Sequence, residues 1–140
     1  MGMSENMKGA HRLVLEGVSK GDMSVVDDCL AAEYVDHALP PGMPANRDGF
    51  KMFLQAFRAA FPDFTYTIED EMGEGDKVAH RLTGRGTLKG DFQGMKANGK
   101  TAQWQEMHIG RFNGSGKLVE HWATFDMLGM MTQLGYGPGQ

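Results

Sequence analysis

Glu106, His108 and His121 are the side chains of this sequence best placed for proton transfer. They lie in the stretch Gln103–Asp126, which is typical of two strands joined by a tight turn at residues 113–116, where glycines allow a positive φ. Residues two apart on a strand point to the same side, so Glu106 and His108 share one face, and His121 lies on the partner strand. A carboxylate and two imidazoles on neighbouring strands are suited to general acid/base catalysis.

A structural role is the alternative for each of these side chains. His108 could be an interior histidine satisfied by a backbone carbonyl. Glu106 on an inward strand face is costly unless it is paired or functional, so it could pair structurally with His108 or His121. The same three residues could in principle bind a metal, but no HxH or HExxH spacing is present and we predict no metal site.

Polar residues at the ends of predicted elements are further candidates. Tyr34, Asp36 and His37 follow the second predicted helix, where they either contact a ligand or only organise a loop. Asp126 ends the second strand and precedes an apolar run. It either turns toward a ligand or caps the last helix, and an aspartate before such a run favours the cap.

The remaining histidines and Trp122 receive structural interpretations. Trp122 is opposite in phase to His121, so we expect it to pack beneath a helix. His80 lies on a predicted strand of unresolved facing and His11 on a predicted helix, and we expect a structural role for both.

Three helices are predicted ahead of the strands that must position these residues. The first has apolar residues at positions 7, 10, 14 and 18, Ser4 as its N-cap and Gly21 as its stop. Asp22 caps the second, which presents Met23, Val26 and Leu30 on one face, and residues 32–44 then form a loop. The third helix is marked by an apolar stripe and ends at Pro62; the stripe consists of Phe50, Phe53, Leu54, Phe57 and Phe61.

After Pro62 the spacing of apolar residues changes from helical to alternating. Residues 64–68 and 78–87 are predicted strands joined by a turn at residues 71–77, and residues 88–100 form an irregular connection. A short helix begins at Met127 and a tail follows it. The pattern is α+β, with helices on one face of a strongly curved, mostly antiparallel sheet. Polar residues at inward positions indicate that the sheet encloses a pocket.

Length and charge narrow the function classes. A chain of 140 residues with 41% hydrophobic residues fits one domain. A net charge of -4 without blocks of like charge indicates neither nucleic acid nor a membrane surface as partner. The sequence has no apolar run long enough to span a bilayer and no signal-peptide core, so we expect a cytoplasmic protein whose partner is a small molecule. The single cysteine, Cys29, excludes an internal disulfide.

The order of several motifs resembles the SnoaL-like polyketide cyclases of the nuclear transport factor 2-like superfamily, over nearly the whole chain. The segments are Tyr34–His37, Phe61–Phe64, Gly99–Lys100, His108–Phe112, Gly116–Trp122, Asp126, Leu128 and Gln133–Gly135. Length and composition predict a single domain over residues 1–140, and we expect its ends to be frayed at about 1–5 and 136–140. The resemblance implies a cone formed by the curved sheet and its helices, with a largely apolar pocket and assembly as a homodimer or tetramer through the sheet. The cyclases of this family close a ring by intramolecular aldol condensation, without metal or cofactor.

One position departs from the family's pattern. The family's acid/base aspartate follows the last strand's histidine by two residues, where this chain has Ala123. His108 matches a family histidine, while Glu106 stands where the cyclases have glutamine and Asp36 where they have asparagine. The resemblance also places Trp104, in phase with Glu106, as an apolar wall of the pocket.

The leading hypothesis is a cofactor-independent enzyme that acts on a small hydrophobic cyclic or carbonyl-bearing molecule. Its predicted catalytic residues are Glu106, His108 and His121, and its predicted substrate-binding residues are Tyr34, Asp36, Trp104, Ala123 and Asp126. Isomerisation, dehydration or hydrolysis are alternatives on the same fold. A non-catalytic protein that binds a hydrophobic ligand is the alternative from another class. Glu106 or Asp36 buried in the cavity with a raised pKa and no salt-bridge partner would favour the enzyme. Carboxylates that are all neutralised or turned outward would favour the binding protein.

Overall fold

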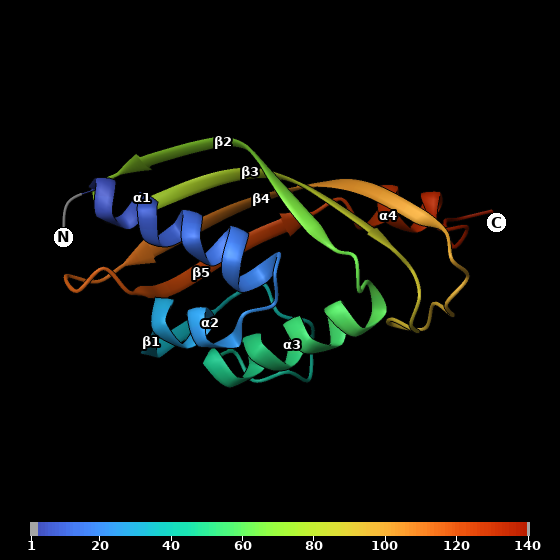
Figure 1. Ribbon diagram of the computed structural model, residues 1–140, viewed down its shortest axis with the longest axis horizontal. Coiled ribbons are helices and arrows are strands. Elements are labelled where there is room, and N and C mark those ends of the chain that lie inside the picture. Colours follow the sequence, from blue (N-terminus) through green and yellow to red (C-terminus); the bar gives the residue numbers. More distant parts are fainter. Residues whose placement is uncertain (1–2, 140) are drawn as a thin grey trace.

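Helices cover one face of a curved, open five-stranded sheet in the computed structural model, which describes residues 3–139 (Figure 1). The α+β architecture predicted from the sequence is confirmed. None of the described helices is long and apolar enough to cross a membrane. The helices are α1 (Met3–Arg12), a π-helical continuation η1 (Leu13–Val18), α2 (Met23–Cys29), α3 (Arg47–Ala60) and α4 (Met127–Gln133). The strands are β1 (Leu30–Asp36), β2 (Thr65–Glu74), β3 (Lys77–Thr87), β4 (Thr101–Phe112) and β5 (Leu118–Phe125).

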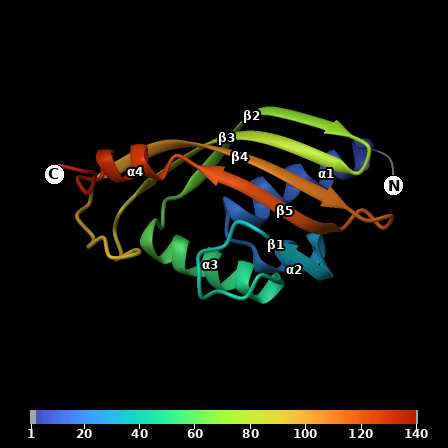
Figure 2. The same cartoon turned by 180° about the vertical axis from the view of Figure 1, so that it is seen from behind.

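The strands are ordered β1-β5-β4-β3-β2. Neighbours from β2 to β5 are antiparallel, while the edge strand β1 runs parallel to β5. Seen from both sides, α1 crosses one face of the sheet, while α2 and α3 lie beside β1 (Figures 1 and 2). The register aligns His80 with His108 and His108 with Ala123, so these residues form a row across three strands on the helix-covered face.

The helix α3 forms where the aromatic stripe predicted it. Asn46 caps its start, with its side-chain oxygen 2.9 Å from the Gly49 nitrogen, and Phe61 ends it just before Pro62. The buried face of the stripe joins an aromatic cluster that includes Phe64 and Trp104. This cluster forms one half of the core. The other half combines residues of α1, η1, α2, β1 and α3 with residues of β3, β4 and β5.

The segment after the second helix was predicted wrongly. Its Asp22 cap is confirmed, with the side chain accepting from the Ser24 nitrogen at 3.0 Å. The helix ends at Cys29, however, and residues 30–36 form β1 rather than a helix end and a loop. The cause is a long-range pairing with β5, which local spacing does not reveal. The prediction of Ser4 as an N-cap is also wrong, since residue 4 lies inside α1.

Smaller differences concern the sheet. The strand β2 continues to Glu74, so the predicted turn at residues 71–77 shrinks to Gly75 and Asp76. Trp122 does not pack beneath a helix: it lies on the outer face of β5 and stacks on His37, with ring centroids 5.2 Å apart. The connection at residues 88–100 is irregular, as predicted, with one isolated bridge.

The predicted frayed ends fall partly outside the described residues, which exclude 1, 2 and 140. Residues 3–5 begin α1. Near the other end, the Tyr136 hydroxyl donates to the Lys96 carbonyl at 2.7 Å.

We expect Phe61→Ala to lower the free energy of unfolding by about 3–5 kcal/mol, because it removes a fully buried ring from the aromatic cluster. Denaturant titration of the full chain measures this loss. The matched control is Met52→Ala on the exposed side of α3, which should change the value by less than about 0.5 kcal/mol. A loss at Phe61 no larger than that of the control would contradict this description of the core.

Candidate active site

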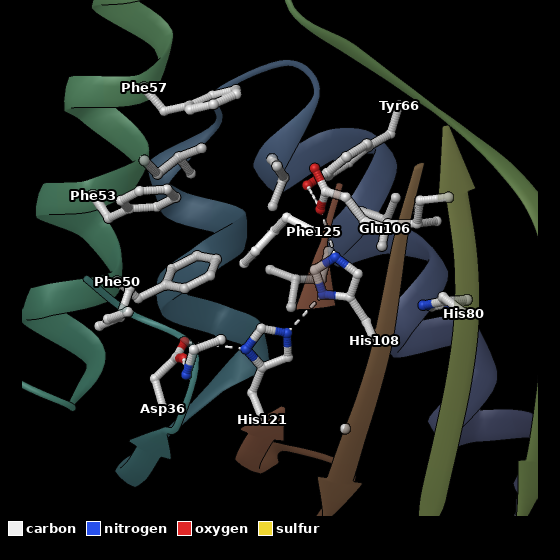
Figure 3. Close-up of a pocket in the computed structure, with 18 of the residues that line it drawn as sticks. Asp36, Phe50, Phe53, Phe57, Tyr66, His80, Glu106, His108, His121 and Phe125 are labelled. Atoms are coloured by element: carbon white, nitrogen blue, oxygen red, sulfur yellow. Dashed lines mark hydrogen bonds and ion pairs between the residues drawn. The ribbon is translucent and has the colours of Figure 1, made fainter. Parts of the chain in front are cut away.

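A cavity of about 360 Å³ lies between the helices and the covered face of the sheet. Its walls are mostly apolar, with Phe50, Phe53 and Phe57 of α3 on one side and strands β3 to β5 on the other (Figure 3). No lysine or arginine is among the lining residues of the described chain. The few polar groups of the wall therefore meet a ligand in a region of low dielectric constant, where their interactions are strong.

Four polar side chains of the wall form a continuous hydrogen-bonded chain, which we term the relay: Asp36, His121, His108 and Glu106 (Figure 3). Asp36 Oδ2 lies 3.2 Å from His121 Nδ1, and His121 Nε2 lies 2.8 Å from His108 Nδ1. His108 Nε2 completes the relay at 2.7 Å from Glu106 Oε1. The relay thus has a carboxylate at each end and two stacked imidazoles between them.

Further donors hold each carboxylate of the relay. The Tyr34 hydroxyl donates to Asp36, whose other oxygen accepts from the Ala38 nitrogen at 2.8 Å. At the opposite end, the Tyr66 hydroxyl donates to Glu106 Oε1 and Trp104 Nε1 donates to Oε2 at 2.7 Å. Asp36 and Glu106 are each only 3% exposed, so these donors replace the water that the carboxylates lose.

Strand geometry explains why these residues meet. Glu106 and His108 alternate with outward residues on β4, and the parallel pairing of β1 with β5 sets Asp36 beside His121. Trp104 needs space across the strand: an added Cβ at Gly84 would lie only 2.8 Å from its indole. A glycine at this position lets the indole reach Glu106.

Counting protons gives the relay its chemical character. Its three internal contacts each need one hydrogen, but two neutral imidazoles supply only two. The complete relay therefore contains one further proton, carried by one imidazole or by one carboxyl group, and has a net charge of -1. Such a relay can accept a proton at one position and release one at another.

The electrostatic surroundings direct that proton. Burial raises the pKa of Asp36, but the hydrogen bonds and charge of His121 and the Tyr34 hydroxyl outweigh it, so the pKa lies below its ordinary value. Burial lowers the pKa of His108 more strongly than Glu106 raises it. Burial also raises the pKa of Tyr66 well above its ordinary value, so this phenol stays a donor. Because both pKa values are lowered, Asp36 and His108 are unfavourable positions for the further proton.

The predicted site residues are only partly brought together. Tyr34 and Asp36 join the predicted catalytic set, and Trp104 contacts Glu106, although it does not line the cavity. Ala123 pairs with His108 across β4 and β5, so the position of the family aspartate adjoins the relay. Asp126 is neither in the relay nor among the lining residues, so its predicted substrate-binding role is not supported. It caps α4 and accepts from the Gly129 nitrogen at 2.9 Å, which is the role that the sequence favoured.

Two further residues of the wall were not predicted as part of the site. Tyr66 lies within the strand predicted at residues 64–68 without any role in the site, yet its hydroxyl donates to Glu106. The only indication in the sequence was that this tyrosine brings a hydroxyl group into a strand with alternating apolar residues. His80 was given a structural role, but it lines the cavity opposite His108. Within the described residues, no three His, Cys, Asp or Glu side chains are grouped to hold a metal ion, since the relay forms a line rather than a shell.

Comparisons with known proteins give a consistent result. The model of the family described as SnoaL-like polyketide cyclase matches residues 8–134. IdmH of Streptomyces antibioticus, a candidate polyketide cyclase, is 31% identical, with 93% of this chain and 98% of that chain covered and a TM-score of 0.81. A comparison with curated proteins found no match.

Two other solved structures support the fold. TsrD of Streptomyces laurentii has a TM-score of 0.87 at 24% identity, with 97% of this chain and 98% of that chain covered. AclR of Streptomyces galilaeus, a candidate hydroxylase, has a TM-score of 0.85 at 26% identity, with 98% and 89% covered. These similarities confirm the cone-like fold expected from the sequence.

The pKa shifts predict loss of stability in acid. The unfolded His108 titrates near 6.5 and the folded ring lower, so between these values the unfolded chain binds more protons and acid favours unfolding. The free energy of unfolding should fall below about pH 6.5, by up to about 1.4 kcal/mol per pH unit for such a histidine. Asp36 acts in the same direction at lower pH, because its ionised form stabilises the fold and is lost as the pH falls through its folded pKa.

Urea unfolding at a series of pH values measures this dependence. His108→Gln should flatten it just below pH 6.5. His37→Gln, at an exposed position, is the matched control. An identical slope for wild type and His108→Gln would contradict the assignment of His108 as a buried neutral ring.

Proposed function

The chain belongs to the SnoaL-like polyketide cyclase family, and from this premise we propose that it is a cofactor-independent enzyme that closes or rearranges a ring in a small hydrophobic carbonyl compound. The observation that carries the proposal is the relay, which places titratable groups on the wall of an otherwise apolar cavity. Its mechanism is acid/base catalysis by Glu106, His108 and His121.

Glu106 is the base in this proposal. Its carboxylate removes the proton from a carbon next to the substrate's carbonyl, leaving an enolate. The enolate carbon forms a bond to a second carbonyl carbon, whose oxygen becomes an alkoxide. The further proton of the relay passes to that oxygen, and the abstracted proton restores the relay through His108 and His121. No proton is gained or lost overall, and Tyr66 and Trp104 hold Glu106 in position throughout.

The cavity wall supports a neutral, ring-shaped substrate. Aromatic side chains of α3 provide faces for stacking or edge contact. A carboxylate or phosphate on the substrate would lose its water without a lysine or arginine of the described wall to replace it. The repulsion would be increased by the net negative charge of the relay.

A second candidate is a protein that binds a hydrophobic ligand without turnover. Three observations favour it: Ala123 replaces the family aspartate, both buried carboxylates have partners, and the pKa of Asp36 is lowered rather than raised. These partners, however, are imidazoles, which can gain and lose protons, rather than fixed cations. We therefore favour the enzyme, in which Glu106 and Asp36 take over the charge that is missing at Ala123.

We expect Glu106→Gln and His108→Ala each to lower kcat/KM by about 10²–10⁴-fold, because each removes one proton-transfer group. The assay is a screen of polyketide-like β-keto esters and aromatic ketones. Glu33→Gln and His37→Ala, at exposed positions of the same residue types, are the matched controls. Ligand binding to each variant is measured in parallel by the change in tryptophan fluorescence.

The outcomes separate the two candidates. Turnover by wild type and the controls but not by the relay variants supports the enzyme. Binding without turnover by any of them supports the binding protein, and activity gained by Ala123→Asp alone would then show that the chain lost catalysis at this position.

We also propose that the chain forms a homodimer through the face of the sheet that the helices leave uncovered. Large apolar side chains are exposed there on three strands: Val35, Met72, Met107 and Ile109. Trp122 pairs with Ile109 on the same face. Such a patch on an otherwise polar surface is typical of a protein interface.

Sedimentation velocity should show a dimer at micromolar concentration for wild type and a monomer for Ile109→Asp, because a charge in the patch would be buried without a partner. Met52→Asp, exposed on α3, should remain dimeric. A monomeric wild type would contradict the proposal.

A further inference from the structure

A second line of titratable groups runs from the surface to the cavity wall. His11 of α1, Glu71 of β2 and His80 of β3 are joined through one carboxylate oxygen, Glu71 Oε2. This oxygen lies 3.1 Å from His11 Nδ1 and 2.8 Å from His80 Nε2. The side chains become steadily less accessible along the line, at 51%, 21% and 6% exposed.

His80 is the inner end of this line and belongs to the cavity wall. It points inward from β3, in the register position opposite His108 (Figure 3). Its Nε2 is engaged by Glu71, while its Nδ1 has no hydrogen-bond partner within residues 3–139. A ring nitrogen on the wall of a cavity that has no partner within the described residues is available to a ligand or to water.

The contact with Glu71 selects the tautomer of this ring. An ionised Glu71 only accepts hydrogen bonds, so a neutral His80 places its proton on Nε2 and leaves a lone pair on Nδ1. Burial lowers the pKa of His80 more than Glu71 raises it. Burial acts to raise the pKa of Glu71, but His80 and His11 outweigh it, so the pKa lies below its ordinary value. A neutral His80 ring beside an ionised Glu71 is therefore the favoured state.

We propose that His80 is a second proton-transfer group of the cavity, acting at Nδ1, and that Glu71 and His11 connect it to solvent. A proton taken up at Nδ1 forms an imidazolium beside the Glu71 carboxylate. The proton on Nε2 then passes to Glu71 and on to His11 or water, leaving a neutral ring protonated at Nδ1. A proton moving in the opposite direction restores the first tautomer. The line can therefore exchange protons between the cavity and solvent in either direction.

The charges around this line favour an ionised Glu71. On the outer side, the groove that contains His11 and Glu71 is also lined by Lys8, Arg12 and Lys20, with Glu16 as the other carboxylate. On the inner side, the nearby titratable group is His108, whose pKa is lowered in part by the charge of His80. The relay and this second line are thus electrostatically coupled without a hydrogen bond between them.

The inference rests on the proposed function, since a path for protons serves a cavity in which protons are transferred. The alternative is a structural ion pair in which His80 is held permanently as an imidazolium or with its proton on Nδ1. Nitrogen-15 NMR of the histidine rings in the full chain distinguishes them without any substrate. Its result is therefore independent of whether turnover is found.

At neutral pH we expect His80 to be the neutral Nε2–H tautomer. Glu71→Gln should lower the pKa of His80 by about one unit, because the variant removes a nearby negative charge. It should also slow exchange of the Nε2 proton with water about tenfold, because the variant removes a general base. Glu69→Gln changes an exposed carboxylate two residues earlier on β2 and should leave the pKa and the exchange rate of His80 unchanged. The NMR signals that disappear in His80→Gln are assigned to His80.

The opposite results overturn the proposal. They are a permanent imidazolium, an Nδ1–H tautomer in the resting protein, or an exchange rate that Glu71→Gln leaves unchanged. Should Glu71→Gln fail to fold, the tautomer of His80 in the wild-type chain decides alone, because only Nε2–H leaves Nδ1 free to accept a proton.

Discussion

The burial of two carboxylates in a cavity whose described wall has no lysine or arginine is the constraint on which the rest of the site depends. Asp36 and Glu106 are almost inaccessible, and an ion in such surroundings is stable only if hydrogen-bond donors replace its water. Lysine or arginine would neutralise them permanently. The surrounding residues supply histidine, tyrosine, tryptophan and backbone donors instead. The charge is thereby retained in a form that can exchange protons, which is the property that acid/base chemistry requires.

The same constraint offers a physical reason for the alanine at position 123, where the family has an aspartate. The structure places this alanine directly across from His108, so a carboxylate there would add a third negative charge beside the relay. Like charges at this spacing would raise one another's pKa and favour protonation. Carboxylates at Asp36 and Glu106, where the family has amides, are compatible with an apolar residue at position 123. The three differences thus form one consistent redistribution of charge.

Local patterns predicted the parts of the structure that depend on neighbours in sequence. The aromatic stripe identified α3, the Asp22 and Asp126 caps were placed correctly, and alternation set Glu106 and His108 on one face. Asp36 was expected at a helix-to-loop transition because its strand exists only through pairing with β5. The hydroxyl of Tyr66 and the inward position of His80 were missed for the same reason, since their partners Glu106 and Glu71 are chosen by the tertiary fold.

The parallel edge strand β1 has a consequence for the time course of folding. Asp36 and His121 are separated by 85 positions in the chain, whereas His108 and His121 are separated by 13. Closing a loop of the larger size costs chain entropy before its contacts form, and topologies rich in such contacts fold slowly. The β4–β5 hairpin can therefore assemble early with its histidines in place, while the relay is completed only when β1 docks. A nascent chain still short of β5 contains Asp36 and its neighbours but no relay, so the relay exists only in the fully assembled domain.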